Sequence, residues 1–79
     1  MKEKLIVRAF WDSEANVWVA ESDDVPGLIT ESDNMEHLIT KLHTLIPELL
    51  EENGMLDQSD TQEIPFHLYS ERKEKVRCV

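Results

Sequence analysis

One apolar stripe with helical period is the feature that most constrains this chain. Residues 35–50 place apolar side chains at steps of three and four, the spacing of one face of an α-helix. The stripe consists of Met35, Leu38, Ile39, Leu42, Leu45, Ile46, Leu49 and Leu50. Asn53 and Gly54 supply a helix stop after it. Pro47 inside the stripe is expected to kink the helix, because proline has no N–H to donate to the carbonyl of His43.

A capping box is the expected start of this helix. Asp33 and Glu36 have the D-x-x-E spacing in which two side chains satisfy free backbone N–H groups of the first turn. At the other end Glu48, Glu51 and Glu52 crowd the last turns, where the helix dipole favours cations. Because conflicts with a local preference often mark functional sites, these three acids are candidates for binding a partner. The alternative is an ordinary solvated acidic face.

Four segments around the helix are typical of β-strands, and the first two, joined by a polar loop, predict a β-hairpin. The strand segments are residues 4–11, 17–21, 28–31 and 64–71. A polar loop at residues 55–63 separates the helix from the last strand. The expected fold is α+β: a single domain over residues 1–79, built as a two-layer β-β-β-α-β unit. One long helix is expected on one face of a mixed sheet.

A tight turn precedes the third strand. Pro26 fixes its own φ and Gly27 tolerates a positive φ, so Asp24, Pro26 and Gly27 predict a structural turn. Asp23 and Asp24 are adjacent carboxylates beside this turn, and two carboxylates can bind a metal or serve in acid–base chemistry. Adjacent acids in a turn are more often solvated or bonded to the backbone, so we expect no metal site here.

Both faces of the expected sheet carry apolar side chains. The first strand turns Trp11 to one face and Phe10 to the other, and the second strand does the same with Trp18 and Val19. A single helix covers only one face, and soluble monomers rarely leave a large aromatic patch in water. We therefore expect a homo-oligomer, a dimer or higher, with Trp11, Trp18 and Phe10 in its interface.

Charge is distributed unevenly along the chain. There are 8 Lys plus Arg against 17 Asp plus Glu, a formal net charge of −9. Residues 1–8 carry +2 and residues 72–79 carry +3, so residues 9–71 carry −14, with Lys41 as their only base. A body this acidic repels a phosphate backbone. We therefore expect no nucleic-acid partner. A small basic protein is the kind of partner that fits this charge.

No segment or residue cluster indicates a membrane span or an enzyme. No stretch approaches the roughly 18 apolar residues of a membrane helix, and the N-terminus does not resemble a signal peptide. One cysteine, Cys78, cannot form an internal disulfide, so a reducing, cytoplasmic setting is expected. His37, His43 and His67 lack a ligand or catalytic spacing. We expect no catalytic residues, no metal and no cofactor.

The order of these segments resembles a known family. The segments that carry the resemblance are F-W-D at residues 10–12, V-W-V-A at residues 17–20, and S-D-D-V-P-G-L-I-T-E at residues 22–31. A capped helix follows these segments. This order resembles the HicB-like antitoxin superfamily of bacteria and archaea, and most closely a stand-alone, uncharacterised branch without a DNA-binding domain. The resemblance covers roughly residues 4–71.

The resemblance implies a β-β-β-α-β unit similar to a truncated RNase H fold that lacks the catalytic carboxylates. HicB antitoxins bind and mask a small basic RNA-cleaving toxin and usually form dimers or larger oligomers. The C-terminal DNA-binding domain of such antitoxins has no counterpart here, so autoregulation on DNA is not expected. Two functions stay open. One is a non-catalytic protein-interaction module that neutralises a basic toxin. The other is a stand-alone homo-oligomeric domain with a ligand-sensing or scaffolding role.

Overall fold

The computed structural model describes residues 4–56 and 63–78. Its helix and strands follow the order β-β-β-α-β. They are β1 (Leu5–Asp12), β2 (Val17–Glu21), β3 (Ile29–Ser32), α1 (Met35–Glu52) and β4 (Phe66–Glu71). Most of the loop expected at residues 55–63 lies outside the described ranges.

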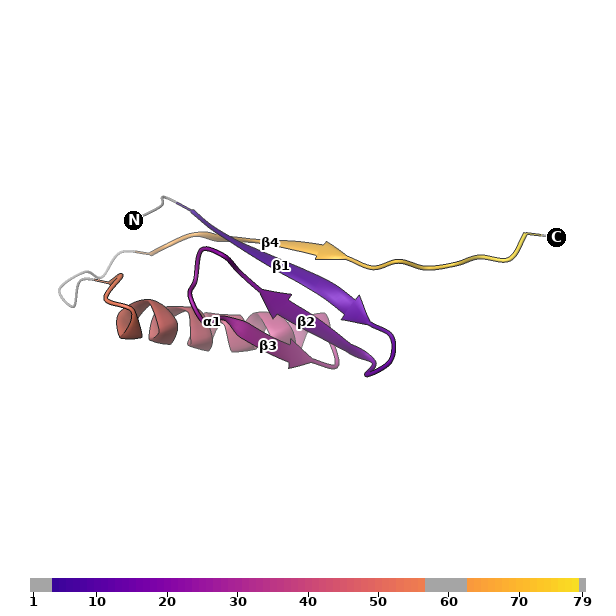
Figure 1. Ribbon diagram of the computed structural model, residues 1–79, viewed down its shortest axis with the longest axis horizontal. Helices are drawn as coiled ribbons and strands as arrows, with labels where there is room; N and C mark the ends of the chain where they lie inside the picture. The colour runs from indigo at the N-terminus through magenta and orange to yellow at the C-terminus, as the bar shows by residue number, and fades with distance from the viewer. Residues whose placement is uncertain (1–3, 57–62, 79) are drawn as a thin grey trace.

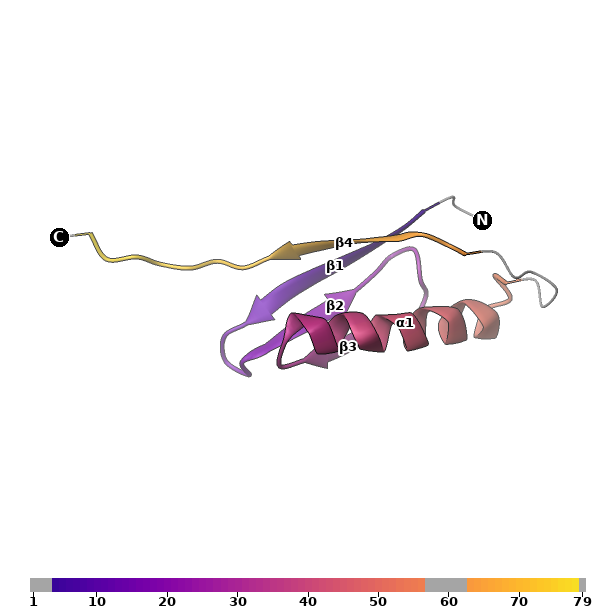
Figure 2. The same cartoon turned by 180° about the vertical axis from the view of Figure 1, so that it is seen from behind.

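The strands form one mixed sheet, and α1 covers one of its faces. Strand order is β3-β2-β1-β4. β1 pairs antiparallel with β2, β2 pairs antiparallel with β3, and β1 pairs parallel with β4. The helix lies against β2 and β3, as the views from the two sides show (Figures 1 and 2). The predicted α+β fold, with a mixed sheet and one long helix on one face, is confirmed.

The apolar stripe of α1 forms the centre of the core. Its buried members recur every fourth residue, and they are Leu38, Leu42, Ile46 and Leu50. Against them pack buried side chains of β1, β2 and the turn before β3, namely Leu5, Val7, Ala9, Ala20, Val25 and Leu28. Each leucine buried in this way stabilises the fold by about 1.5–3 kcal/mol relative to exposure, which is what holds the helix on the sheet.

The start of α1 differs from the predicted capping box. Its N-cap is Asn34, whose side-chain oxygen accepts a hydrogen bond from the backbone N–H of His37 at 2.8 Å. Asp33 and Glu36 therefore do not cap the helix as a pair, and that prediction was wrong. Asp33 and Asn34 are both good N-cap residues, but β3 runs on to Ser32 and leaves Asp33 in the connection.

The end of α1 forms as predicted. Gly54 has a φ of 67°, and its N–H donates to the carbonyl of Glu51 at 3.0 Å. The N–H of Met55 donates to the carbonyl of Leu50 at 2.8 Å. These two bonds define a Schellman motif after the C-cap Asn53, so the last carbonyls of the helix are satisfied by the chain that leaves it.

The turn before β3 also forms as predicted. Gly27 has a φ of 84°, and the N–H of Leu28 donates to the carbonyl of Val25 at 3.1 Å. Pro26 and Gly27 are thus the central residues of a β-turn of type II, which requires a positive φ at its third position.

Two side chains beside this turn extend the pairing of β1. The β1–β2 register ends with Arg8 opposite Glu21. Beyond that point the backbone N–H of Ile6 donates to Asp24 Oδ2 at 2.8 Å, and the carbonyl of Ile6 accepts from Ser22 Oγ at 2.6 Å. Asp24 and Ser22 therefore replace the strand partner that β2 no longer supplies, and they fix the segment before the turn to β1.

The two edges of the sheet differ. At β3, Lys41 Nζ donates to the backbone carbonyl of Glu31 at 2.6 Å, so a side chain from α1 occupies part of that edge. At the opposite edge β4 continues beyond Glu71 as an exposed segment that leads away from the body (Figures 1 and 2). We call residues 72–78 the C-terminal arm. The arm contributes to a longest molecular extent of 60 Å, against 21 and 18 Å in the other directions.

Candidate functional site

The face of the sheet opposite α1 is the candidate functional surface. Side chains alternate along a strand, so residues one step from the core positions share this face. Cross-strand pairing sets Phe10 opposite Val19 and Arg8 opposite Tyr69 on it. Its apolar members, which we call the open sheet face, are Ile6, Phe10, Val17, Val19, Ile29 and Tyr69.

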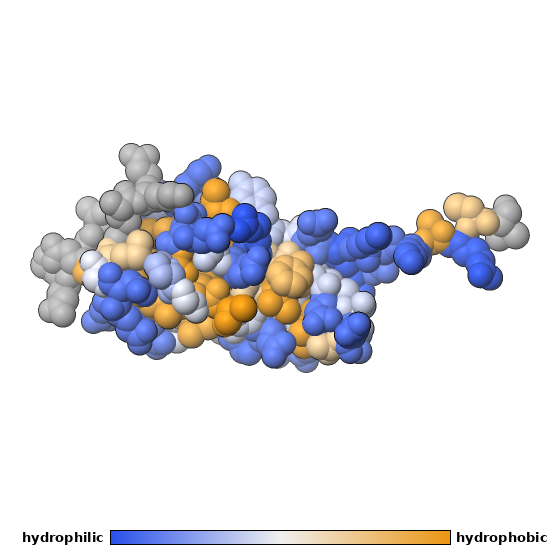
Figure 3. All heavy atoms as spheres, viewed as in Figure 1, coloured by the Kyte–Doolittle hydropathy of each residue, from blue (hydrophilic) through white to orange (hydrophobic). Residues whose placement is uncertain are grey.

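The open sheet face is substantially exposed to solvent. Phe10 is 41% exposed, Tyr69 55% and Ile29 71%. Figure 3 looks onto this face, and apolar side chains gather there over the strands with hydrophilic ones around them. No described element covers this face, since α1 lies on the other side of the sheet (Figure 2).

Carboxylates are interspersed with the apolar residues of this face. Glu21, Glu31 and Glu71 lie directly opposite Ile29, Val19 and Phe10, respectively. The strands contribute one arginine or lysine to the face, Arg8, and its Nη2 lies 2.7 Å from Asp23 Oδ2. The hydrogen bond that Arg8 donates to Asp23, and then the charge of that carboxylate, raise the pKa of Arg8 above its ordinary value. Because Asp23 neutralises this base, the face as a whole is apolar and acidic.

The predicted interface residues do not share one surface. Trp11 and Trp18 pair across β1 and β2 on the helix side of the sheet, with ring centroids 5.5 Å apart at 65°. Trp18 packs against the core, and Arg72 Cζ lies 4.2 Å from the Trp11 ring centroid. Phe10 lies on the open sheet face. Trp11 and Trp18 therefore lie on the face opposite to Phe10, because neighbouring residues of a strand point to opposite faces, and the role of these three residues in an oligomer interface stays a prediction.

The acids at the end of α1 are exposed, as expected for partner-binding residues or for a solvated face. Glu48, Glu51 and Glu52 form no ion pair with another described residue, and no base occurs in the last turn. They lie on the helix layer and not on the open sheet face. Their role in binding a partner stays a prediction.

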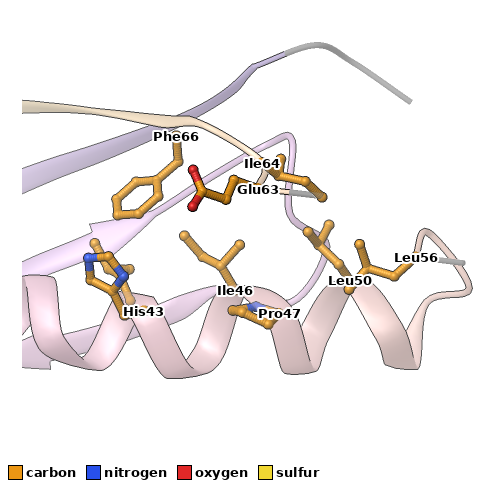
Figure 4. A pocket seen from close by; sticks show the side chains of 9 residues that line it. His43, Ile46, Pro47, Leu50, Leu56, Glu63, Ile64 and Phe66 are labelled. Atoms are coloured by element: carbon orange, nitrogen blue, oxygen red, sulfur yellow. The ribbon is translucent and has the colours of Figure 1, made fainter. Parts of the chain in front are cut away.

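A cavity of about 550 Å³ opens between the second half of α1 and the start of β4 (Figure 4). It is lined by Leu42, His43, Ile46, Pro47, Leu50, Leu56, Glu63, Ile64 and Phe66. His43 meets the ring of Phe66 edge-on, with centroids 5.5 Å apart. The helix continues through Pro47 to Glu52. The lining is mostly apolar with one carboxylate and one imidazole, a composition suited to a small apolar ligand.

Groups that could carry metal chemistry are not brought together. Within residues 4–56 and 63–78, no cluster of three or more His, Cys, Asp or Glu side chains could hold a metal ion. His37, His43 and His67 are all exposed, as expected of surface histidines. No helix in the described part of the chain is long and apolar enough to cross a membrane.

Ile29 and Tyr69 were missed as candidate surface residues when only the aromatic residues of the first two strands were considered. Strand alternation contains the signal for both, but it identifies the exposed face only after the strand register is known. The role of Ser22 in holding the turn segment to β1 was also missed, because its hydrogen bond to the carbonyl of Ile6 joins residues 16 positions apart.

Comparisons with known proteins place this fold in a family. The model of a family described as Domain of unknown function (DUF1902) matches residues 4–79. No curated protein matches the chain. The chain is similar to the crystal structure of a hypothetical protein from the extremely thermophilic bacterium Thermus thermophilus. The two are 49% identical, with a TM-score of 0.68, over 95% of this chain and 99% of that one. The chain therefore belongs to the DUF1902 family.

Proposed function

We infer that this chain is a non-catalytic protein-interaction module of HicB-antitoxin type that binds and neutralises a small basic RNA-cleaving protein. The observation that carries this inference is the open sheet face, which leaves Phe10, Ile29 and Tyr69 exposed on a sheet whose other face is covered by α1. Contiguous exposed apolar surface on a small protein is typical of a docking site.

The charge around this face favours a basic partner. Glu21, Glu31 and Glu71 border the apolar residues, while Arg8 is neutralised by Asp23. An interface with an apolar centre and charged surroundings derives affinity from the centre and specificity from the charges. A partner with lysine or arginine around an apolar patch fits this arrangement.

The acids of the helix end contribute to attraction over distance. Glu48, Glu51 and Glu52 lie on the other layer, so a partner on the open sheet face does not contact both sets at once. They add to the negative field of residues 9–71, which carry a formal charge of −14. Such a field accelerates the encounter with a basic protein, and salt screens the effect.

A cytoplasmic setting belongs to the same proposal. It is supported by the exposed thiol of Cys78, since reducing compartments keep lone thiols free.

A ligand-sensing role is the second candidate, and the cavity between α1 and β4 favours it. Its volume of about 550 Å³ lies within the range of small-molecule sites, and its lining is mostly apolar. In that case the chain acts as a homo-oligomeric sensor or scaffold and needs no basic partner.

Affinity capture from the native lysate at low salt, compared between three forms of the chain, tests the first proposal. The forms are wild type, Ile29→Glu and Thr44→Glu. Ile29→Glu places a charge at an exposed apolar position on the β3 side of the open sheet face, whereas Thr44→Glu adds the same charge at an exposed position of α1. The captured protein is then assayed for RNA cleavage with and without each form.

The expected result is a small basic ribonuclease that wild type and Thr44→Glu inhibit and Ile29→Glu does not. If Ile29→Glu captures and inhibits the same protein as well as wild type does, the open sheet face is not the docking site. If wild type captures only its own chain, the antitoxin-type function is wrong and the homo-oligomeric alternative is favoured.

A further inference from the structure

We propose that two copies of this chain pair through the outer edge of β4, with the C-terminal arm of each copy lying along β4 of the other. The two sheets, related by a two-fold axis at Arg72, then form one continuous sheet. The pairing groups belong to the backbone edge of β4, although the side chains of Tyr69 and Glu71 also lie on the open sheet face, and the pairing does not depend on the basic partner inferred above.

The first reason is that no described residue pairs with the backbone groups at the outer edge of β4. The N–H of Leu5 donates to the carbonyl of Pro65 at 3.2 Å, so the odd-numbered residues at this end of β4 turn their backbone groups toward β1. By alternation Phe66, Leu68 and Ser70 turn theirs outward, where no described strand lies. Natural sheets usually protect such an edge. Lys41 does so at β3, but β4 has no counterpart among the described residues.

The second reason is the composition of the arm. Its residues are exposed and already continue the direction of β4 (Figures 1 and 2). Residues 72–78 carry four bases and one acid, a formal charge of +3, beside a body of −14. Val76, at 85% exposure, is the most exposed large apolar residue of the described chain. β4 carries one acid, Glu71, and no lysine or arginine, so a basic arm with one apolar residue can lie along this edge of a second copy without meeting another base of that strand.

The third reason is complementarity in one register. When two β4 strands run antiparallel about Arg72, Glu71 of one copy lies opposite Lys73 of the other, and Leu68 lies opposite Val76. Each pair occurs twice by symmetry, and cross-strand pairs of these kinds are stabilising. Arg72 itself stacks on Trp11, and its Nε lies 2.6 Å from Glu74 Oε1, so its charge is compensated within its own chain.

Cysteine pairing tests this register in the full-length chain. Tyr69 and Lys75 are both exposed and lie opposite each other in the proposed dimer, in a pair without backbone hydrogen bonds, where side chains approach closest. Within one chain they stand about 20 Å apart along the extended backbone, too far for a disulfide. Two double-cysteine variants are compared in a Cys78→Ser background. The first combines Tyr69→Cys and Lys75→Cys. The second combines Tyr69→Cys and Arg77→Cys, and its cysteines lie opposite each other only if the register shifts by two residues.

The expected result is a disulfide-linked dimer that forms about tenfold faster with the Tyr69 and Lys75 pair than with the Tyr69 and Arg77 pair. Faster linkage of the second pair overturns the Arg72-centred register. Equal and slow linkage of both overturns pairing through β4. A dimer that persists without linkage of either pair assigns self-association to another surface, such as the open sheet face, and also overturns the proposal.

A charge exchange supplies a second readout without cysteine. Lys73→Glu sets two acids opposite each other at both symmetry-related positions, and the dimer dissociation constant should rise about tenfold. Adding Glu71→Lys to this variant restores opposite charges and should return the constant to within about threefold of wild type. Sedimentation measures both values. If Glu71→Lys gives no rescue, these residues do not face each other and the register is wrong.

Discussion

The carboxylate of Asp24 accepts a hydrogen bond from the backbone N–H of Ile6 at 2.8 Å, across 18 residues of sequence. This N–H sits where β2 has already ended, so the side chain stands in for a strand. Asp24→Ala leaves the donor without its acceptor and should lower the free energy of unfolding by about 1–3 kcal/mol. Urea titration measures the loss.

Asp24→Asn is the matched control, because its amide oxygen can accept the same bond at similar volume. It should retain most of the stability. If Asp24→Ala is as stable as wild type, this hydrogen bond does not hold the turn segment to β1.

Gly27→Val tests the positive φ of the turn. At a φ of 84° a β-branched residue is strained, whereas the added Cβ would meet Leu49 Cδ2 at an ordinary 3.6 Å. The variant should therefore lose about 1 kcal/mol or more through backbone strain and not through a clash. Thermal unfolding measures it. Gly27→Asn should lose less, since asparagine tolerates this region, and equal losses for both would argue against strain as the cause.

Asn34→Ala tests the helix cap. Removing the acceptor for the N–H of His37 should cost about 1 kcal/mol. Asp33→Ala should cost less, because Asp33 does not bond a free N–H of the first turn. Chemical denaturation of the two variants decides the matter: a greater loss for Asp33→Ala would restore the carboxylate as the cap.

Replacing Glu48, Glu51 and Glu52 together with Gln separates stability from binding. The fold should be as stable as wild type or slightly more so, because the acids oppose the helix dipole. Association with a basic partner should slow, and its dependence on salt should weaken. Stopped-flow rates at two ionic strengths measure this. An unchanged rate with the same salt slope identifies the three acids as a solvated face.

The chain should show no metal-dependent cleavage of RNA or DNA. The expectation comes from the partners of the two adjacent carboxylates. Asp23 pairs with Arg8, and Asp24 accepts a hydrogen bond from the backbone N–H of Ile6. A labelled RNA incubated with the purified chain and Mg²⁺ should remain intact. Cleavage that disappears in Asp24→Asn, in a sample whose fold is unchanged, would make this carboxylate catalytic.

Local patterns predicted most of the fold. Leu38 and Leu42 recur at a period that only a helix buries, and Gly27 and Gly54 occupy backbone conformations that other residues avoid. The N-cap was misplaced by one residue because Asp33 and Asn34 have similar capping strength. Only the length of β3, which depends on its pairing with β2, decides between them.

The candidate site was less predictable, because it depends on contacts between distant segments. Alternation separates Phe10 from Trp11 but does not say which of them the helix covers. That choice follows from the packing of α1 against β2 and β3. The bonds from Ser22 and Asp24 to Ile6 connect residues with no local pattern in common, so no periodicity reveals them.

The contact between Lys41 and the carbonyl of Glu31 has a consequence for assembly. A sheet open at both edges can add copies without limit and grow into a fibre. Here a cation from the helix occupies part of the β3 edge, whereas no described side chain bonds the outer edge of β4, so strand addition is favoured on the β4 side. An assembly that grows by strand pairing must then stop once that side is filled, which makes it finite by construction. Lys41, the only lysine or arginine of residues 9–71, would thereby limit how far such an assembly grows.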